Sequence, residues 1–189
     1  MKLLIIDNYD SFTYNLVQLV EEAGQTDNVI IKNDRLDGII SADFDKVLIS
    51  PGPGIACETG QLPEFIARYY TSKSFLGVCL GFEALLEFFG GHLKQLSEPM
   101  HGIQNKGFVV KRDLLFRGLE KPFLIGHYHS WVAIPDDFPV ELEVSVKDDM
   151  DQIMAFHHKQ YDLYGVQFHP ESFMTPQGCK MIANWLNFS

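Results

Sequence analysis

The chain has 189 residues, of which 46% are hydrophobic and 21% charged, and its formal net charge is −10. This composition is that of an ordinary globular protein and excludes collagen, coiled coil and intrinsic disorder. No basic cluster offsets the acidic excess, which argues against nucleic acid and against an anionic membrane surface as partners.

We predict a single domain over residues 1–189, because a chain of this length builds one core. The three cysteines are Cys57, Cys79 and Cys179. An odd and sparse count argues against a disulfide framework and for a reducing compartment. The opening apolar run, residues 3–6, is too short for a signal peptide or a membrane span. We therefore predict a cytoplasmic protein.

The first half of the chain alternates short buried strands with helices. Strands are predicted at residues 3–6, 29–31, 46–50 and 75–78, and helices at residues 12–23, 63–70 and 83–89. This alternation predicts an α/β fold with a mostly parallel open sheet and helices on both faces.

The second half contains strands separated by turns. Strands are predicted at residues 108–110, 131–134, 142–146, 153–156 and 164–168, and a closing helix at residues 178–187. We expect these strands to add an antiparallel part to the sheet.

The sharpest local feature lies between a predicted strand and a helix and reads Gly77-Val78-Cys79-Leu80-Gly81. It matches the nucleophile elbow with Cys in place of Ser. The turn places Cys79 at the carboxyl end of the sheet, where ligands of open α/β sheets bind, and the helix N-terminus there favours a thiolate. We predict Cys79 as a nucleophile, with a buried core cysteine as the alternative. Cys57 and Cys179 lack this setting and are predicted to be structural.

A nucleophilic cysteine needs a base, and His169 is the best candidate among seven histidines. It follows a buried strand, and Glu171 stands two residues on, where a carboxylate could orient the imidazole. A surface histidine beside the turn residue Pro170 is the alternative. His127 and His129 alternate on an extended stretch and could equally face a partner.

The segment Ser50-Pro51-Gly52-Pro53-Gly54 ends another predicted parallel strand. Its backbone N–H groups could hold a developing oxyanion, although a plain turn is the alternative. It lacks the Lys-Ser or Lys-Thr of a phosphate loop, and no residue cluster has metal-ligand spacing, so neither a metal nor a cofactor is predicted. These features predict a cysteine-dependent acyl transferase or hydrolase.

Taken together, these two segments and Gly165-Val166-Gln167-Phe168-His169-Pro170-Glu171-Ser172 resemble the class I (triad-type) glutamine amidotransferases. The opening residues 7–18, DNYDSFTYNLVQ, resemble in particular the glutaminase subunits of anthranilate synthase and aminodeoxychorismate (p-aminobenzoate) synthase. The resemblance extends along the whole chain.

The resemblance implies a glutaminase in which Cys79 attacks the carboxamide of L-glutamine and His169, oriented by Glu171, carries the proton. It implies that the N–H groups of Gly54 and Leu80 hold the oxyanion. It further implies glutamine-binding roles for Gly52, Gly54, Glu83, Ser130 and Trp131. The ammonia would pass, without a cofactor, to a chorismate-binding synthase subunit (component I), in p-aminobenzoate (folate) or anthranilate (tryptophan) synthesis.

Four residues depart from the family's pattern. Phe82-Glu83 stand where His-Gln is usual, Ile103 replaces a Lys, and His127 replaces an Arg. The usual Gln contacts the substrate, and Glu83 has nearly its shape but carries a charge. A catalytically impaired pseudo-amidotransferase, which binds and regulates an ammonia-dependent synthase, is therefore an alternative. A different thiol hydrolase on this fold, such as a γ-glutamyl hydrolase, is disfavoured by residues 7–18.

Overall fold

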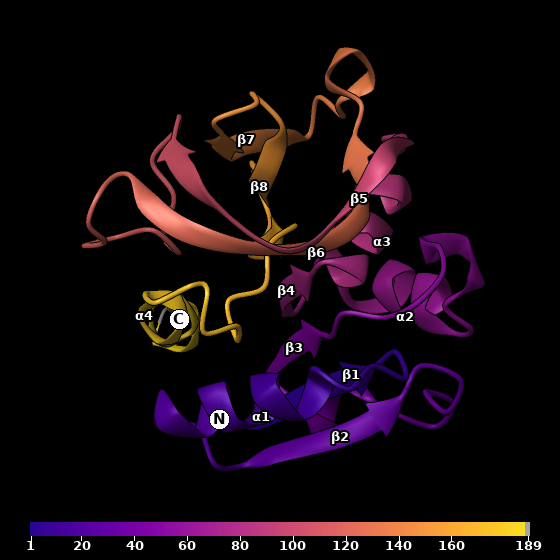
Figure 1. The fold of residues 1–189 in the computed structure, drawn as a ribbon. Coiled ribbons are helices and arrows are strands. Elements are labelled where there is room, and N and C mark those ends of the chain that lie inside the picture. The colour runs from indigo at the N-terminus through magenta and orange to yellow at the C-terminus, as the bar shows by residue number, and fades with distance from the viewer. Residues whose placement is uncertain (188–189) are drawn as a thin grey trace.

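The computed structural model describes residues 1–187, with the side chain of Cys57 excepted. Within this part, nine strands form one sheet in the order β2-β1-β3-β4-β9-β8-β7-β5-β6 (Figure 1). The strands are β1 (Leu3–Asp7), β2 (Asn28–Lys32), β3 (Lys46–Ile49), β4 (Ser74–Val78), β5 (Leu93–Val109), β6 (Phe123–Ala133), β7 (Leu142–Asp148), β8 (Ile153–His158) and β9 (Leu163–Val166).

The sheet is parallel from β2 to β9 and antiparallel from β9 to β6, which confirms the predicted α/β fold. β9 comes from the end of the chain and pairs with β4 from the first half. This pairing brings the predicted nucleophile and the predicted base to neighbouring strands. No helix in the described part of the chain is both long and apolar enough to cross a membrane.

Helices cover both faces of the parallel part (Figure 1). The helices are α1 (Thr13–Glu22), α2 (Leu62–Tyr69), α3 (Leu80–Phe88) and α4 (Gly178–Leu186). Short 3₁₀ turns lie at Ser41–Asp43, Ala56–Glu58 and Pro135–Asp137. Because strand side chains alternate between faces, β1 sends Leu3 and Ile5 into one core cluster and Leu4 and Ile6 into the other.

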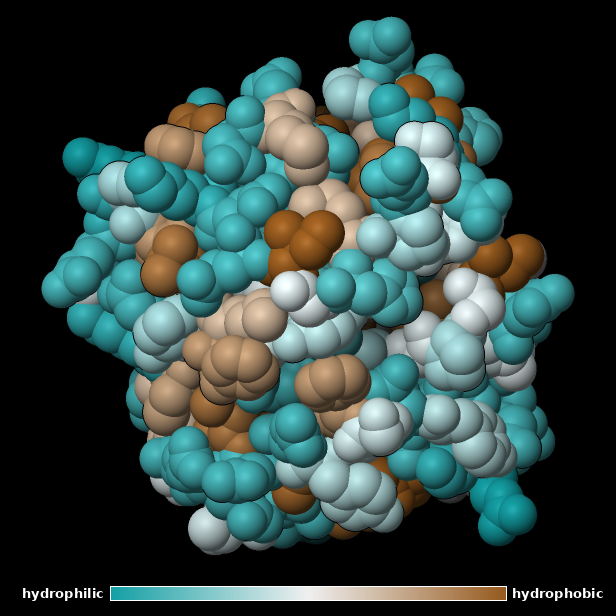
Figure 2. All heavy atoms as spheres, in the orientation of Figure 1, coloured by the Kyte–Doolittle hydropathy of each residue, from teal (hydrophilic) through white to brown (hydrophobic). Residues whose placement is uncertain are grey.

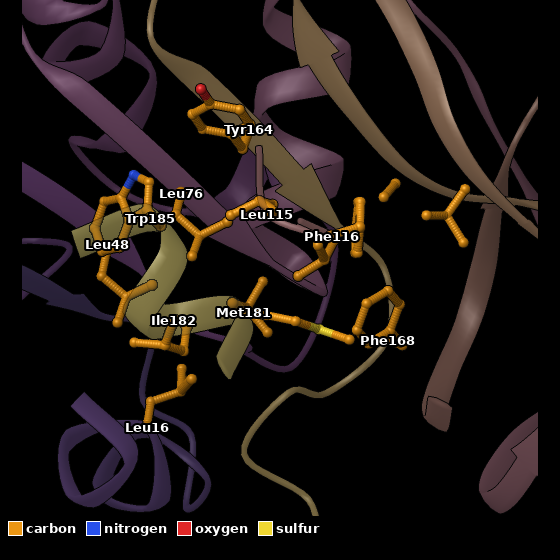
Figure 3. Close-up of a cluster of buried hydrophobic side chains, with 14 of the residues drawn as sticks. Leu16, Leu48, Leu76, Leu115, Phe116, Tyr164, Phe168, Met181, Ile182 and Trp185 are labelled. Atoms are coloured by element: carbon orange, nitrogen blue, oxygen red, sulfur yellow. The ribbon is translucent and has the colours of Figure 1, made fainter. Parts of the chain in front are cut away.

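The first cluster joins α1 and α4 to the sheet, and Figure 3 shows Met181, Ile182 and Trp185 of α4 packed near Leu48 and Leu76. The second joins α2 and α3 to the opposite face. Outside these clusters, the face shown in Figure 2 is mostly hydrophilic with small hydrophobic patches, in keeping with the high net charge.

β5 and β6 differ most from the predicted elements. They have 17 and 11 residues, whereas the sequence predicted strands only at residues 108–110, near the end of β5, and at residues 131–134, near the end of β6. β5 carries mostly exposed residues, so its sequence has little hydrophobic alternation, and its register against β6 shifts between Gln95 and Met100. Pairing with β6, not burial, satisfies its backbone. α3 begins at Leu80, three residues earlier than predicted, and β9 ends at Val166, two residues earlier.

Candidate active site

The carboxyl ends of β1, β3, β4 and β9 are neighbours in the sheet, with Ile49 opposite Gly77 and Val78 opposite Val166. The segments that follow these strands therefore emerge along one edge. They hold the predicted loop at residues 50–54, Cys79, and the His169–Glu171 pair. This edge is where open α/β sheets bind their ligands.

Cys79 occupies the turn between β4 and α3 with a backbone conformation of φ 53° and ψ −104°. A positive φ in a residue with a Cβ costs about 1–3 kcal/mol and must be held by its surroundings. The Cys79 N–H donates to the carbonyl of Val166 at 2.8 Å. A Cβ on Gly77 would collide with the backbone of Gly81, and one on Gly81 would lie 2.7 Å from the carbonyl oxygen of Ile49. Both glycines are needed for this turn.

The Cys79 thiol is buried, and burial is the largest cause that raises its pKa well above the ordinary value. Glu83, when it is ionised, and the charge of Glu171 raise this pKa further, and the backbone N–H of Leu80 lowers it only in part. Burial therefore opposes the thiolate that the helix N-terminus was predicted to favour. A base must remove its proton.

His169 and Glu171 form a buried pair in which imidazole Nδ1 lies 2.6 Å from carboxylate Oε1. This contact places the Nδ1 proton toward Glu171 and leaves Nε2 as the acceptor. Nε2 has no hydrogen-bond partner among the described residues. Two aromatic rings pack against the imidazole, with centroid distances of 5.3 Å to Phe12 and 5.0 Å to Tyr128. The pair is thus fixed, with one nitrogen free to take a proton.

The turn that carries this pair is anchored by Thr175. Its hydroxyl donates to the carbonyl of His169 at 2.7 Å and accepts the N–H of Gly126 at 3.0 Å. The His169 N–H donates in turn to the carbonyl of Gly126 at 3.0 Å. At the start of α4, a Cβ on Gly178 would collide with the carbonyl of Pro170. The turn is therefore tied to β6 on one side and packed against α4 on the other.

The loop after β3 is held by Asn8, which follows β1. The Asn8 backbone N–H donates to Ser50 Oγ at 2.9 Å, and its side-chain amide donates to the Ser50 carbonyl at 2.8 Å. Gly52 is packed so closely that a Cβ there would lie 2.6 Å from Asn8 Cβ. Gly54 has φ +86°, which suits glycine. The opening segment of the chain thus shapes the predicted oxyanion loop.

A cavity of about 350 Å³ lies beside the thiol, a volume typical of small-molecule sites. Its lining residues are Gly52, Pro53, Gly54, Ile55, Cys79, Glu83, Gln95, His101, Tyr128, His129, Ser130 and Trp131. Cys79 and the predicted binding residues Gly52, Gly54, Glu83, Ser130 and Trp131 are therefore brought together. Leu80 contributes its N–H beside the Cys79 thiol.

The two competing histidines on β6 are buried inside the chain, so their side chains are not exposed on its surface. His127 Nδ1 lies 2.9 Å from His129 Nε2, and His129 Nδ1 lies 2.9 Å from the carbonyl of Trp131. Burial lowers the pKa of His127 to about 4 and that of His129 to about 3. Both are neutral at pH 7, and the Trp131 carbonyl fixes a proton on His129 Nδ1.

Two further contacts of the site escaped the sequence analysis. The Gln167 side-chain amide donates to Glu83 Oε1 at 3.0 Å and to Cys79 Sγ at 3.8 Å. Phe12 packs on His169 from the opposite end of the chain. The sequence could have pointed to Gln167 through its position, two residues before His169. Nothing local marks Phe12, because its partner is 157 positions away in the sequence.

Cys179 is partly buried on α4 and is not among the residues that line this cavity, and the side chain of Cys57 lies outside the described residues. In the described part of the chain, no group of three or more His, Cys, Asp or Glu residues could hold a metal ion.

Comparison with known proteins relates nearly the full length of the chain to one protein family. The family model of glutamine amidotransferase class-I matches residues 4–187. The chain is 40% identical to aminodeoxychorismate synthase component 2 of Escherichia coli over 98% of this chain and 99% of that protein. It is 41% identical to anthranilate synthase component 2 of Lactococcus lactis over 98% of this chain and 93% of that protein.

A crystal structure of a glutamine amidotransferase from Thermotoga maritima has the same fold, with a TM-score of 0.75 at 16% identity over 90% of this chain and 76% of that one. The family model and these relatives each cover nearly the full length of the chain. The chain belongs to the class I glutamine amidotransferases.

Proposed function

We propose that this protein is the glutaminase subunit of an anthranilate or aminodeoxychorismate synthase, with Cys79, His169 and Glu171 as its catalytic residues. One observation carries the proposal. A cysteine on a strained strand–helix turn shares a sheet edge with a rigid, buried histidine–carboxylate pair and opens into a cavity of about 350 Å³.

In the proposed reaction, Cys79 Sγ attacks the carboxamide carbon of glutamine while His169 Nε2 accepts the thiol proton. The tetrahedral intermediate then breaks its C–N bond, and His169 returns the proton to the leaving nitrogen, which departs as ammonia. Water, deprotonated by His169, cleaves the thioester and releases glutamate. The Glu171 carboxylate stabilises the imidazolium in both steps.

The backbone around the thiol is arranged to hold the oxyanion and the substrate. The Leu80 N–H already points to the thiol, and Gly54 lines the cavity. We assign the oxyanion to these two N–H groups, because preorganised donors stabilise charge as it develops. Gly52 and the backbone of Ser130 and Trp131, which line the same cavity, would hold the amino-acid end of glutamine.

The names of the relatives point to a partner. Component 2 of each synthase is named as one part of a complex, and residues 4–187 of this chain form only the amidotransferase part. We propose that the ammonia passes to a chorismate-binding component I, in a heterodimer. A cytoplasmic location stays a prediction from the sparse cysteines.

The experiment is to mix the pure protein with a component I subunit from the same source and chorismate. Product formation is measured with glutamine, or with ammonia, as the sole nitrogen source. We expect glutamine to support aromatic-amine formation with release of glutamate. Cys79→Ala should abolish this activity and leave the ammonia-dependent reaction intact. The amine formed, anthranilate or the p-aminobenzoate precursor, identifies the pathway.

The alternative is a pseudo-amidotransferase that only binds and regulates its synthase. Buried Glu83, where the family usually has Gln, is the observation that favours it. The pseudo-amidotransferase alternative predicts that component I binds this chain but that glutamine never supports product formation. The intact histidine–carboxylate pair and the strained Cys79 turn favour the active enzyme.

A further inference from the structure

Glu83 is buried beside the nucleophile, and no feature of the proposed mechanism uses its charge. It lies in the first turn of α3, four residues after Cys79, is 3% exposed and lines the substrate cavity. Its Oε1 accepts the Gln167 side-chain amide at 3.0 Å, and the same amide group lies 3.8 Å from Cys79 Sγ. One amide therefore links the carboxyl group to the reacting sulfur.

No ion pair joins Glu83 to a cation among the described residues. The other titratable or charged groups near Glu83 lie on α3, around the cavity or on the elements packed against α3. They are Cys79, Glu87, His101, Tyr128, His129, Glu58, Glu64, Arg68, Tyr69 and Tyr164. His129 is kept neutral by burial, which lowers its pKa to about 3. An ionised carboxylate that is buried without a cation costs free energy, and such a group usually keeps its proton instead.

We propose that Glu83 acts as an uncharged carboxylic acid in the glutamine pocket, accepting the Gln167 hydrogen bond on one oxygen and donating its own O–H to bound glutamine. In this form it has the shape and the mixed donor–acceptor character of a glutamine side chain. The substitution of Glu for the usual Gln then preserves the site at neutral pH. This proposal rests on the proposed glutaminase function and names the protonation state that the site requires.

The chemistry of ionisation supports this role. Burial is the largest cause that raises the pKa of Glu83 to about 8, with the charge of Glu87 adding to it and the Gln167 hydrogen bond opposing it. Once ionised, Glu83 loses its donor and raises the pKa of the Cys79 thiol. It also repels the carboxylate of the substrate. Glutaminase activity should therefore fall on the alkaline side as Glu83 loses its proton.

The test compares wild type with Glu83→Gln in the complex with component I, measuring kcat/KM for glutamine from pH 6.5 to 9. The ratio of variant to wild type at pH 6.5–7 is the reference value, because Glu83 is neutral there. At pH 9 about one Glu83 in eleven keeps its proton if the pKa is about 8, so this ratio should rise by about tenfold above its reference value.

The control is Glu64→Gln, which replaces an exposed carboxylate on α2 and should give a ratio to wild type that is flat with pH. A flat ratio for Glu83→Gln as well would overturn the proposal. So would a Glu83→Gln variant that is already about tenfold better at pH 7, because wild-type Glu83 would then be ionised at neutral pH.

A second measurement tests the protonation state without any activity. The unfolded chain ionises Glu83 near its ordinary pKa of 4.5, whereas the folded protein keeps the proton to about pH 8. The free energy of unfolding of wild type should therefore fall relative to Glu83→Gln between these pH values and stay level above pH 8. A pH-independent difference contradicts an uncharged Glu83, whether or not glutamine is hydrolysed. Absence of glutamine-dependent product in both proteins, with this pH dependence intact, would instead count against the proposed function.

Discussion

At the scale of single residues, the site combines a buried thiol with a histidine whose orientation a buried carboxylate fixes. Burial raises the pKa of Cys79, and the 2.6 Å contact with Glu171 sets the tautomer of His169. In the proposed mechanism, formation of the thiolate therefore depends on proton transfer to His169.

Glu171→Gln should keep the orientation of His169 and remove the charge that stabilises its imidazolium. By analogy with the loss of a triad carboxylate, we expect kcat for glutamine hydrolysis to fall by about 10³- to 10⁴-fold. KM for glutamine should change little, because Glu171 does not line the cavity. Steady-state kinetics of the complex check this, with the ammonia-dependent reaction as the control. A loss of less than about tenfold would remove Glu171 from the catalytic residues.

At the scale of elements, the geometry of the pair depends on the turn between β9 and α4. Thr175 is the central residue of that turn, because its hydroxyl both donates to His169 and accepts from Gly126. Both partners are backbone groups in the buried part of the site. A threonine outside the cavity lining thereby fixes the position of the proposed base.

Thr175→Val keeps the shape of the side chain, removes the Thr175 partner of the Gly126 N–H and leaves the His169 carbonyl with the Ser172 N–H alone. A buried polar group without a hydrogen bond costs about 1–3 kcal/mol, so the free energy of unfolding should fall by about that amount or more. We also expect kcat to fall. Urea unfolding and kinetics measure both effects. Thr175→Ser retains the hydroxyl and should restore most of each, and equal stability of the Val and Ser variants would contradict the anchor.

The elements also show which parts of the fold can be predicted from the sequence. The parallel strands are continuous apolar runs ended by turn residues, and all four of the first half were predicted within one or two residues. β5 was largely missed, because its 17 residues are mostly exposed and are held by pairing with β6. Such pairing depends on a strand that is distant in the sequence, and no local periodicity reports it.

The same limit applies to the site. Cys79 and His169 were predictable because each follows a buried strand in a recognisable local segment. The contacts of Gln167 with Glu83 and of Phe12 with His169 join residues 84 and 157 positions apart. Only the order of strands in the sheet brings them together.

At the scale of the whole molecule, one buried carboxylate secures the edge of the sheet that carries the site. Asp7 accepts hydrogen bonds from Lys32 at 2.5 Å, from Thr13 at 3.1 Å and from the Tyr9 N–H at 2.8 Å. It joins the ends of β1 and β2 to the start of α1. Burial raises its pKa, but these hydrogen bonds outweigh burial, and the net pKa lies below the ordinary 3.8.

Asp7→Asn should therefore reduce stability in a pH-dependent way. A carboxylate whose pKa is lower in the folded protein stabilises it above the unfolded pKa, and this contribution disappears as pH falls through the folded pKa. The difference in unfolding free energy between wild type and Asp7→Asn should be constant from pH 5 to 7 and shrink below pH 3.8. Denaturant titrations across this range check it. A difference that grows on acidification would contradict the assignment.

The central claim is that Cys79 is the nucleophile of a glutamine site. The most direct measurement treats the protein with a glutamine analogue that carries a diazoketone in place of the carboxamide, and maps the adduct by peptide mass spectrometry. The thiol displaces dinitrogen and forms a stable thioether. We predict one adduct per chain, on Cys79, suppressed by excess glutamine and absent from Cys79→Ala. Labelling of Cys57 or Cys179 in preference to Cys79, or labelling that glutamine does not suppress, would contradict the claim.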